Sequence, residues 1–149
     1  MTGMTQLPDV REQRPLGYWL KHIDRAIEER FGSLLAGDGL ARRGWQVLNT
    51  ISCEPISVAD IDQAMAPFLS VDEPTMRPYA DRFAEDGWIR IDAADVVELT
   101  EAGREVHRRV SERIGVERVR MMECLSAEDY EVLMSLLQRV AAHLDAPVA

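Results

Sequence analysis

The chain has 149 residues, 46% hydrophobic and 29% charged, a composition that is typical of one globular domain with a sizeable core. No apolar run approaches the ~18 to 20 residues needed to cross a bilayer, and Met1 to Arg14 lack the apolar stretch of a secretion signal, so we expect a cytoplasmic protein without a membrane partner. The formal net charge of -9 argues against general attraction to nucleic acid, although it leaves room for a local basic face.

The first two predicted elements are helices separated by a glycine-rich break. Residues 37–39 (GDG) separate the two helices, and after them Trp45, Leu48 and Ile51 indicate the second, shorter helix, which ends before Pro55. The first helix follows Pro15, and its apolar residues recur mostly every three or four positions: Leu16, Trp19, Leu20, Ile23, Ile27, Phe31, Leu34 and Leu35.

Two more short helices are predicted next. Ser57 with Asp60 three residues later resembles a capping box, which begins a helix that ends near Pro67. A fourth helix is predicted over about 73–86 and ends at Gly87. Alternatively this helix begins at Pro78, because proline is tolerated at the first helical position. Short helices in succession are typical of a helical DNA-reading unit.

A hairpin and two long helices complete the predicted order. Residues 88–91 and 96–99 are rich in β-branched and aromatic side chains and flank a tight loop at 92–95. Thr100 can cap a long helix, in which Gly115 is a weak point. Ser126, with an acidic residue three positions later, begins a last helix with a wide apolar face.

Two segments carry a resemblance to a known family. Residues 80–89 (ADRFAEDGWI) and 99–104 (LTEAGR) resemble the MarR family of winged helix-turn-helix regulators, at the end of the recognition helix and at the exit from the wing. Residues 99–104 also resemble the PadR group of winged-helix proteins. One helix before the winged unit and two helices after it favour the MarR family. The resemblance implies a mainly α fold with a small β-hairpin wing, a single domain over 1–149 with the winged unit at about 40–103 and dimerisation helices at about 15–36 and 104–145.

The function implied by this resemblance is sequence-specific DNA binding by a homodimeric transcriptional regulator, not an enzyme. Two recognition helices would lie about 34 Å apart on a pseudo-palindromic operator. No Gly-rich phosphate loop or catalytic spacing appears in the sequence. The alternative is a degenerate winged helix that serves as a ligand-binding or protein-interaction module, which the net charge, the acidic wing loop and Pro78 favour.

The resemblance also implies which residues contact DNA. Arg77 is the first choice for a base contact, since a forked arginine on guanine discriminates by roughly 1 to 3 kcal/mol. The alternative is that Arg77 and Arg82 are surface charges paired with Asp81 or Glu85. The short wing loop, Asp92-Ala93-Ala94-Asp95, predicts little minor-groove binding. The full set of expected DNA contacts is Arg42, Arg43, Thr75, Arg77, Tyr79, Arg82 and Arg90.

Members of the family commonly bind small aromatic or phenolic ligands beside the dimer-forming helices. Tyr18, Trp19, His22 and Trp45 could line such a pocket, in which a protonated His22 would anchor an acidic ligand. The alternative for Trp19 and Trp45 is core packing, because both fit the apolar stripes.

The cysteines predict neither a metal site nor a cofactor. Cys53 and Cys124 lie far apart in sequence, and neither has a histidine at zinc-ligand spacing. Each lies in or beside an apolar helical stretch, where a free thiol usually packs as a small hydrophobe, with an oxidant-sensing thiol as the alternative.

Overall fold

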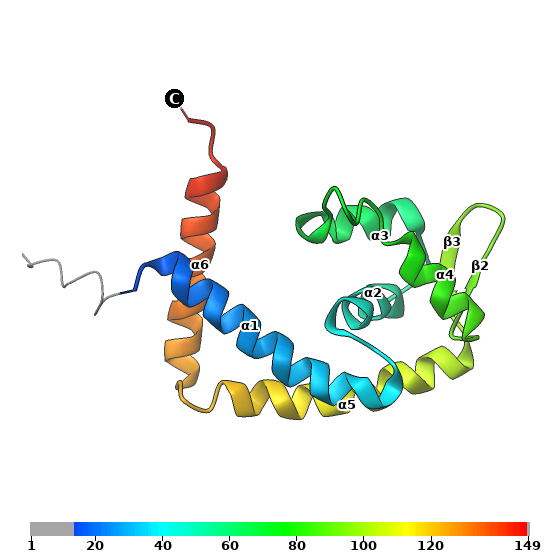
Figure 1. Ribbon diagram of the computed structural model, residues 1–149, viewed down its shortest axis with the longest axis horizontal. Helices are drawn as coiled ribbons and strands as arrows, with labels where there is room; N and C mark the ends of the chain where they lie inside the picture. The colour runs from blue at the N-terminus through cyan, green and yellow to red at the C-terminus, as the bar shows by residue number, and fades with distance from the viewer. Residues whose placement is uncertain (1–13, 149) are drawn as a thin grey trace, which may run out of the picture. The chain divides into compact units, whose positions relative to one another are not determined.

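A computed structural model describes residues 14–148, so most of the segment searched for a secretion signal lies outside it (Figure 1). The described chain is mainly helical with one small antiparallel sheet, which confirms the predicted fold class. In chain order its elements are α1 (Leu16–Leu35), the 3-10 helix η1 (Ala36–Asp38), α2 (Arg42–Ser52), β1 (Ile56–Ser57), α3 (Val58–Ala64), the 3-10 helix η2 (Ala66–Phe68), α4 (Arg77–Glu85), β2 (Ile89–Ile91), β3 (Val96–Leu99), α5 (Glu101–Met121) and α6 (Ala127–Asp145).

The chain divides into two compact units, the first ending at Val110 and the second beginning at Ser111. The first unit holds a continuous apolar core to which its helices and its sheet contribute. Burying these side chains is the main force that holds short helices such as α3 and α4 in place, because a helix this short is marginal alone. Its side chains with under 2% exposure are Leu35, Val47, Leu48, Ile51, Ile61, Met76, Val97 and Val110, together with Ala80.

The sheet has the strand order β1-β3-β2, with both pairings antiparallel. The predicted hairpin is confirmed as β2 and β3, with Ile89 opposite Leu99 and Ile91 opposite Val97. The sequence analysis missed β1, which pairs Ile56 with Val97. A strand of two residues is too short to show the alternation on which strand prediction rests.

The predicted helix caps are present. Ser57 accepts a hydrogen bond from the Asp60 amide at the start of α3, and Ser126 forms a full capping box with Asp129 at the start of α6. Thr100 Oγ1 likewise accepts from the Gly103 amide at 3.1 Å. The proposed weak point at Gly115 does not end α5, which runs to Met121.

The start of α4 differs from both predictions. The helix begins at Arg77, not near residue 73, and Pro78 occupies its second position instead of its first. Thr75 therefore lies before the helix. Asp62 of α3 bonds the Thr75 hydroxyl and the Met76 amide, and these contacts hold the segment after Pro74 in a different conformation.

In the second unit, α6 has no buried residue among its described positions. Its exposed large apolar side chains are Tyr130, Val132, Leu133, Met134, Leu136, Val140 and Leu144, which are 37% to 74% exposed. No helix within residues 14–148 is long and apolar enough to cross a membrane.

The prediction that the cysteines pack as small hydrophobes is wrong, since the free thiols of Cys53 and Cys124 are both exposed. Both follow the apolar stretch of a neighbouring helix rather than facing the core: Cys53 comes after α2 and Cys124 after α5. Over the described residues, no group of three His, Cys, Asp or Glu side chains is arranged to hold a metal ion.

Candidate nucleic-acid interface

The connection between α3 and α4 fixes the start of α4. Asp62 of α3 accepts two hydrogen bonds, from the Met76 amide at 2.6 Å and from the Thr75 hydroxyl at 2.7 Å. Thr75 Oγ1 in turn accepts from the Arg77 amide at 3.1 Å. These bonds satisfy amides that a helix start leaves without partners. The first turn of α4 is therefore held rigidly against α3, and the Thr75 hydroxyl is engaged within the protein.

Arg77 is exposed but paired with two carboxylates. Its Nε donates to Asp81 Oδ1 and its Nη1 donates to Asp95 Oδ1, each at 3.1 Å. These two hydrogen bonds raise the pKa of Arg77, and its side chain is 40% exposed. The pairing with Asp81, one turn along α4, is the alternative that the sequence offered. The partner on the wing loop was not foreseen.

Tyr79 and Arg43 occupy neighbouring positions with their own partners. The Tyr79 hydroxyl donates to Glu73 Oε1 at 2.6 Å, and burial together with that carboxylate raises the pKa of Tyr79 to about 12. The Arg43 guanidinium lies 4.1 Å from the centroid of the Phe68 ring and donates to Gln46. Tyr79 is therefore a neutral donor at physiological pH, and the Arg43 guanidinium lies against an aromatic face.

The other predicted contacts differ in how accessible they are. Arg42 donates to Asp24 at 2.7 Å and Glu28 at 3.3 Å, both on α1, and its side chain is only 22% exposed. Arg82 donates to the Gly39 carbonyl at 3.4 Å. Arg42 thus links α2 to α1, which makes it the predicted residue with the least freedom to reach a phosphate.

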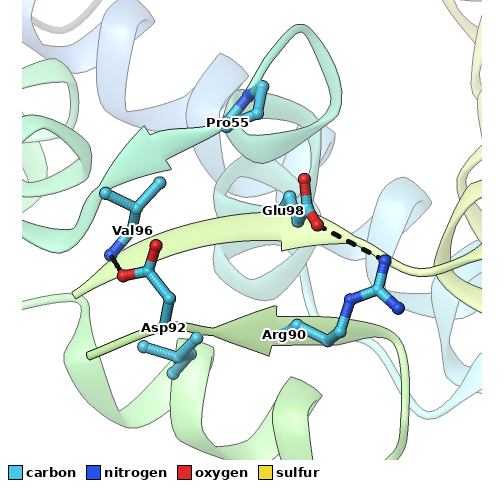
Figure 2. Close-up of a pocket in the computed structure, with 6 residues that line it drawn as sticks. Pro55, Arg90, Asp92, Val96 and Glu98 are labelled. Atoms are coloured by element: carbon cyan, nitrogen blue, oxygen red, sulfur yellow. Dashed lines mark hydrogen bonds and ion pairs between the residues drawn. The ribbon is translucent and has the colours of Figure 1, made fainter. Parts of the chain in front are cut away.

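Arg90 lies on β2 and is 67% exposed at its side chain. Figure 2 shows it across from Glu98 on β3, with a 3.3 Å ion pair between them, in a surface hollow that Pro55 also lines. An ion pair this exposed contributes little and breaks readily. Arg90 is therefore available to a phosphate near the wing.

Hydrogen bonds made by its own aspartates hold the wing loop in a tight conformation. Asp92 accepts from the Ala94 amide at 2.8 Å and the Val96 amide at 3.0 Å, the second of which is drawn in Figure 2. The Asp95 amide donates to the Asp92 carbonyl at 3.1 Å, and Asp95 has a φ of 57°. The loop is compact and carries two carboxylates.

The predicted ligand-binding residues fall into two places. Tyr18, Trp19 and His22 cluster on the first turns of α1, with ring centroids 5.2 to 6.3 Å apart, and Tyr18 and Trp19 are 40% and 49% exposed. Trp45 is buried at 5% exposure and stacks on His107 with centroids 5.1 Å apart. No ring contact between described residues joins Trp45 to the cluster. Core packing, the alternative, thus applies to Trp45 and not to Trp19.

Sequence reasoning missed His107. Its Nε2 lies 2.9 Å from Asn49 Oδ1, and burial lowers the pKa of His107. The available signal was its place directly after Val106, which with Val110 and Ile114 repeats every four residues and forms the buried face of α5, so that position 107 lies at the edge of that face.

No protein-family model and no curated protein matches the sequence, but solved structures match its fold. A mutant MarR from E. coli complexed with operator DNA is 19% identical, with 88% of this chain and 96% of that chain covered and a TM-score of 0.72. The MarR family protein Rv2887 of Mycobacterium tuberculosis, in complex with DNA, is 19% identical over 86% and 98%, with a TM-score of 0.67. NadR in complex with 4-hydroxyphenylacetate is 16% identical over 88% and 98%, with a TM-score of 0.71.

The chain therefore has the winged helix-turn-helix fold of the MarR regulators, as the sequence resemblance implied. The likeness extends over nearly the whole length of each matched chain, and it includes the flanking helices as well as the winged unit. At these identities it establishes the fold, while the chemistry of the surface depends on the residues described above.

Proposed function

We propose that this chain, which has the MarR fold, is a sequence-specific DNA-binding transcriptional regulator that acts as a homodimer. The observation that carries the proposal is the first turn of α4: Asp62 holds it in place, and it presents Arg77 on the surface. Two chains of the same fold, MarR and Rv2887, have been crystallised with DNA. A rigid helix start with an exposed arginine suits readout of a guanine edge in the major groove.

Other basic and polar side chains would position the protein on the phosphates. We assign this role to Arg43, Arg82 and Arg90, whose guanidinium groups have more N–H donors than their contacts within the protein use. Tyr79 belongs to the same set, but its one hydroxyl donor must leave Glu73 to reach a phosphate. Thr75 and Arg42 belong to the predicted set too, but each donates to a carboxylate on a neighbouring helix, Asp62 of α3 and Asp24 of α1, so we expect smaller effects from their replacement.

We propose the homodimer because large apolar side chains are exposed on two helices. Both α1 and α6 expose large side chains, among them Leu16, Trp19 and Leu20 on α1 and Leu133 and Leu136 on α6. An apolar stripe exposed on either of these helices usually marks an interface with another protein chain. A second copy would bury it and would supply the second α4 that a pseudo-palindromic operator requires.

An effector is proposed on the same grounds. The aromatic cluster of Tyr18, Trp19 and His22 offers apolar faces and one titratable ring, which suits a small aromatic or phenolic acid. NadR, of the same fold, was crystallised with 4-hydroxyphenylacetate. Isothermal titration with this compound tests the assignment, and Trp19→Ala should abolish any heat that the wild type gives.

Selection of bound duplexes from a random-sequence library tests DNA recognition. We expect the purified chain to enrich a motif with two related half-sites, and Arg77→Ala to reduce the preference for it while Arg139→Ala, on α6, does not. Binding should weaken steeply as salt is added. Failure of the wild type to enrich any sequence at low salt would refute the proposal.

A second candidate function rests on the pairing of Arg77. Because two carboxylates hold this guanidinium and the wing loop is acidic, the chain could have lost DNA affinity and kept a ligand-binding or protein-interaction role. The library selection separates the two, since only a DNA-reading protein enriches a motif.

A further inference from the structure

The arginine that α4 offers to DNA is already bound by carboxylates of the protein. Arg77, Asp81 and Asp95 form a cluster that we name the Arg77 latch. Because the cluster contains one guanidinium and two carboxylates, its formal charge is -1. An approaching phosphate thus meets a net negative group where an unpaired arginine would be positive.

The two carboxylates differ in origin. Asp81 is on α4 itself, four residues after Arg77, and moves with it. Asp95 comes from the wing loop, 18 positions along the chain, so its contact joins the wing to the helix start. A helical i,i+4 pair is common on any helix surface. The contact with Asp95 is the one that needs a particular loop conformation.

The backbone conformation at Asp95 is one that few residue types adopt. Over residues 14–148, Asp95 is the one residue other than glycine with a positive φ, at 57°. Glycine adopts this region freely, and asparagine and aspartate tolerate it better than other residues do. The Asp95 backbone is held on both sides, because its amide donates to Asp92 and its carbonyl accepts from the Val58 amide at 3.0 Å.

We propose that Asp95 is an intramolecular competitor for Arg77, which lowers the affinity of the protein for DNA. This inference rests on the proposed function and adds to it a residue, Asp95, that limits the affinity for DNA. DNA must displace the wing carboxylate before the Arg77 guanidinium can contact a phosphate or a guanine edge. Of the five N–H groups of this guanidinium, the latch engages two, so the contact can be exchanged stepwise.

The Asp95→Asn variant isolates the charge. Asparagine has the same shape and tolerates a positive φ, so the loop should keep its conformation. Without the carboxylate, Arg77 is free to pair with DNA. We expect the affinity to rise roughly threefold per subunit, and thus about tenfold in the proposed dimer. The slope of log K against log salt should steepen by up to about 0.9 per subunit.

The test uses the full chain and fluorescence anisotropy over a series of salt concentrations. The probes are the random-sequence duplex library and any duplex that the wild type enriches from it. The proteins are the wild type, Asp95→Asn, Arg77→Gln and the double variant. Asp86→Asn is the matched control, because it makes the same charge change at the exposed end of α4, just beyond Glu85.

A gain from Asp95→Asn that disappears in the Arg77→Gln background and is absent from Asp86→Asn supports the latch. An equal gain in the Arg77→Gln background, or from Asp86→Asn, would show a general charge effect and overturn it. If the wild type binds and Asp95→Asn binds no better, the latch fails while the proposed function stands. If only Asp95→Asn binds, the latch is supported and the proposed function of the natural chain fails. If no protein binds, both are overturned.

Discussion

At Gly103 the backbone of α5 approaches the chain before β2 too closely for any side chain. A Cβ built there would lie 1.9 Å from the Trp88 carbonyl oxygen and 2.8 Å from its carbon, and backbone atoms cannot move aside cheaply. We expect Gly103→Ala to lower the free energy of unfolding by about 2 to 4 kcal/mol in urea titrations.

Gly115→Ala is the matched control for this change. It lies on the same helix, and its added Cβ would meet nothing within 4 Å. Alanine is the better helix former, so this variant should gain about 0.5 to 1 kcal/mol. Equal stabilities of the two variants would contradict the close approach at Gly103.

His107 should make the stability depend on pH in a definite direction. Burial lowers its pKa in the folded chain below the ordinary 6.5. As the pH falls below 6.5, the unfolded chain takes up a proton that the folded chain does not, so stability is lost over that window. Replacing this histidine by phenylalanine keeps a ring against Trp45 and should make the loss of unfolding free energy between about pH 6.5 and 5 smaller.

Urea titrations at several pH values give the comparison. Identical slopes for the wild type and His107→Phe would show that His107 does not contribute.

The partners of single residues were predictable only where they are close in sequence. Asp81 stands one turn after Arg77 and was named as a partner, because helical spacing alone brings the two together. Asp95 was not, because its contact depends on how the wing folds back toward α4. Trp45 fitted a core stripe, but its stacking on His107 joins α2 to α5, and no local pattern carries that information.

At the scale of the element, the start of α4 depends on one carboxylate. Asp62 bonds both the Met76 amide and the Thr75 hydroxyl, although α3 and α4 are separate helices. We expect Asp62→Ala to cost about 1 to 2 kcal/mol of unfolding free energy, because the half-buried Thr75 O–H and the amide of the buried Met76 would lose their acceptor. If DNA binding is confirmed, the variant should also bind more weakly, since the first turn of α4 would no longer be held.

Asp60→Ala provides the comparison on the same helix. Asp60 is exposed, and its backbone amide rather than its carboxylate makes the bond to Ser57. We expect its replacement to change stability by less than about 0.5 kcal/mol. A cost as large as that of Asp62→Ala would mean that acidic charge on α3, not the two hydrogen bonds, accounts for the effect.

Elements with a local signal were predicted well, and the others were not. Apolar periodicity and the serine caps located α1, α3 and α6, because both signals arise within the helix itself. The start of α4 was placed too early because its real boundary is set by Asp62 on another helix. Likewise β1 forms only because β3 offers it an edge.

For the whole molecule, charge and oligomeric state are linked. Two copies would carry twice the formal charge of -9, so DNA binding must come from a small basic surface repeated at the correct spacing. One copy presents one Arg77 with a few flanking arginines, so we expect a single copy to bind DNA only weakly against the repulsion of the acidic body. We therefore expect the proposed dimer to be required for DNA affinity as well as for reading two half-sites.

This dependence can be tested on α6. Leu133 is 40% exposed and lies on the apolar stripe with Tyr130, Leu137 and Val140, whereas Ser135 lies on the opposite side of the same helix. We expect Leu133→Asp to shift the protein from dimer to monomer in sedimentation velocity and to abolish DNA binding with it. The same charge introduced by Ser135→Asp should leave both intact. A Leu133→Asp protein that remains dimeric would place the interface elsewhere, and a monomer that still binds DNA tightly would break the link between assembly and affinity, because one acidic copy would then suffice.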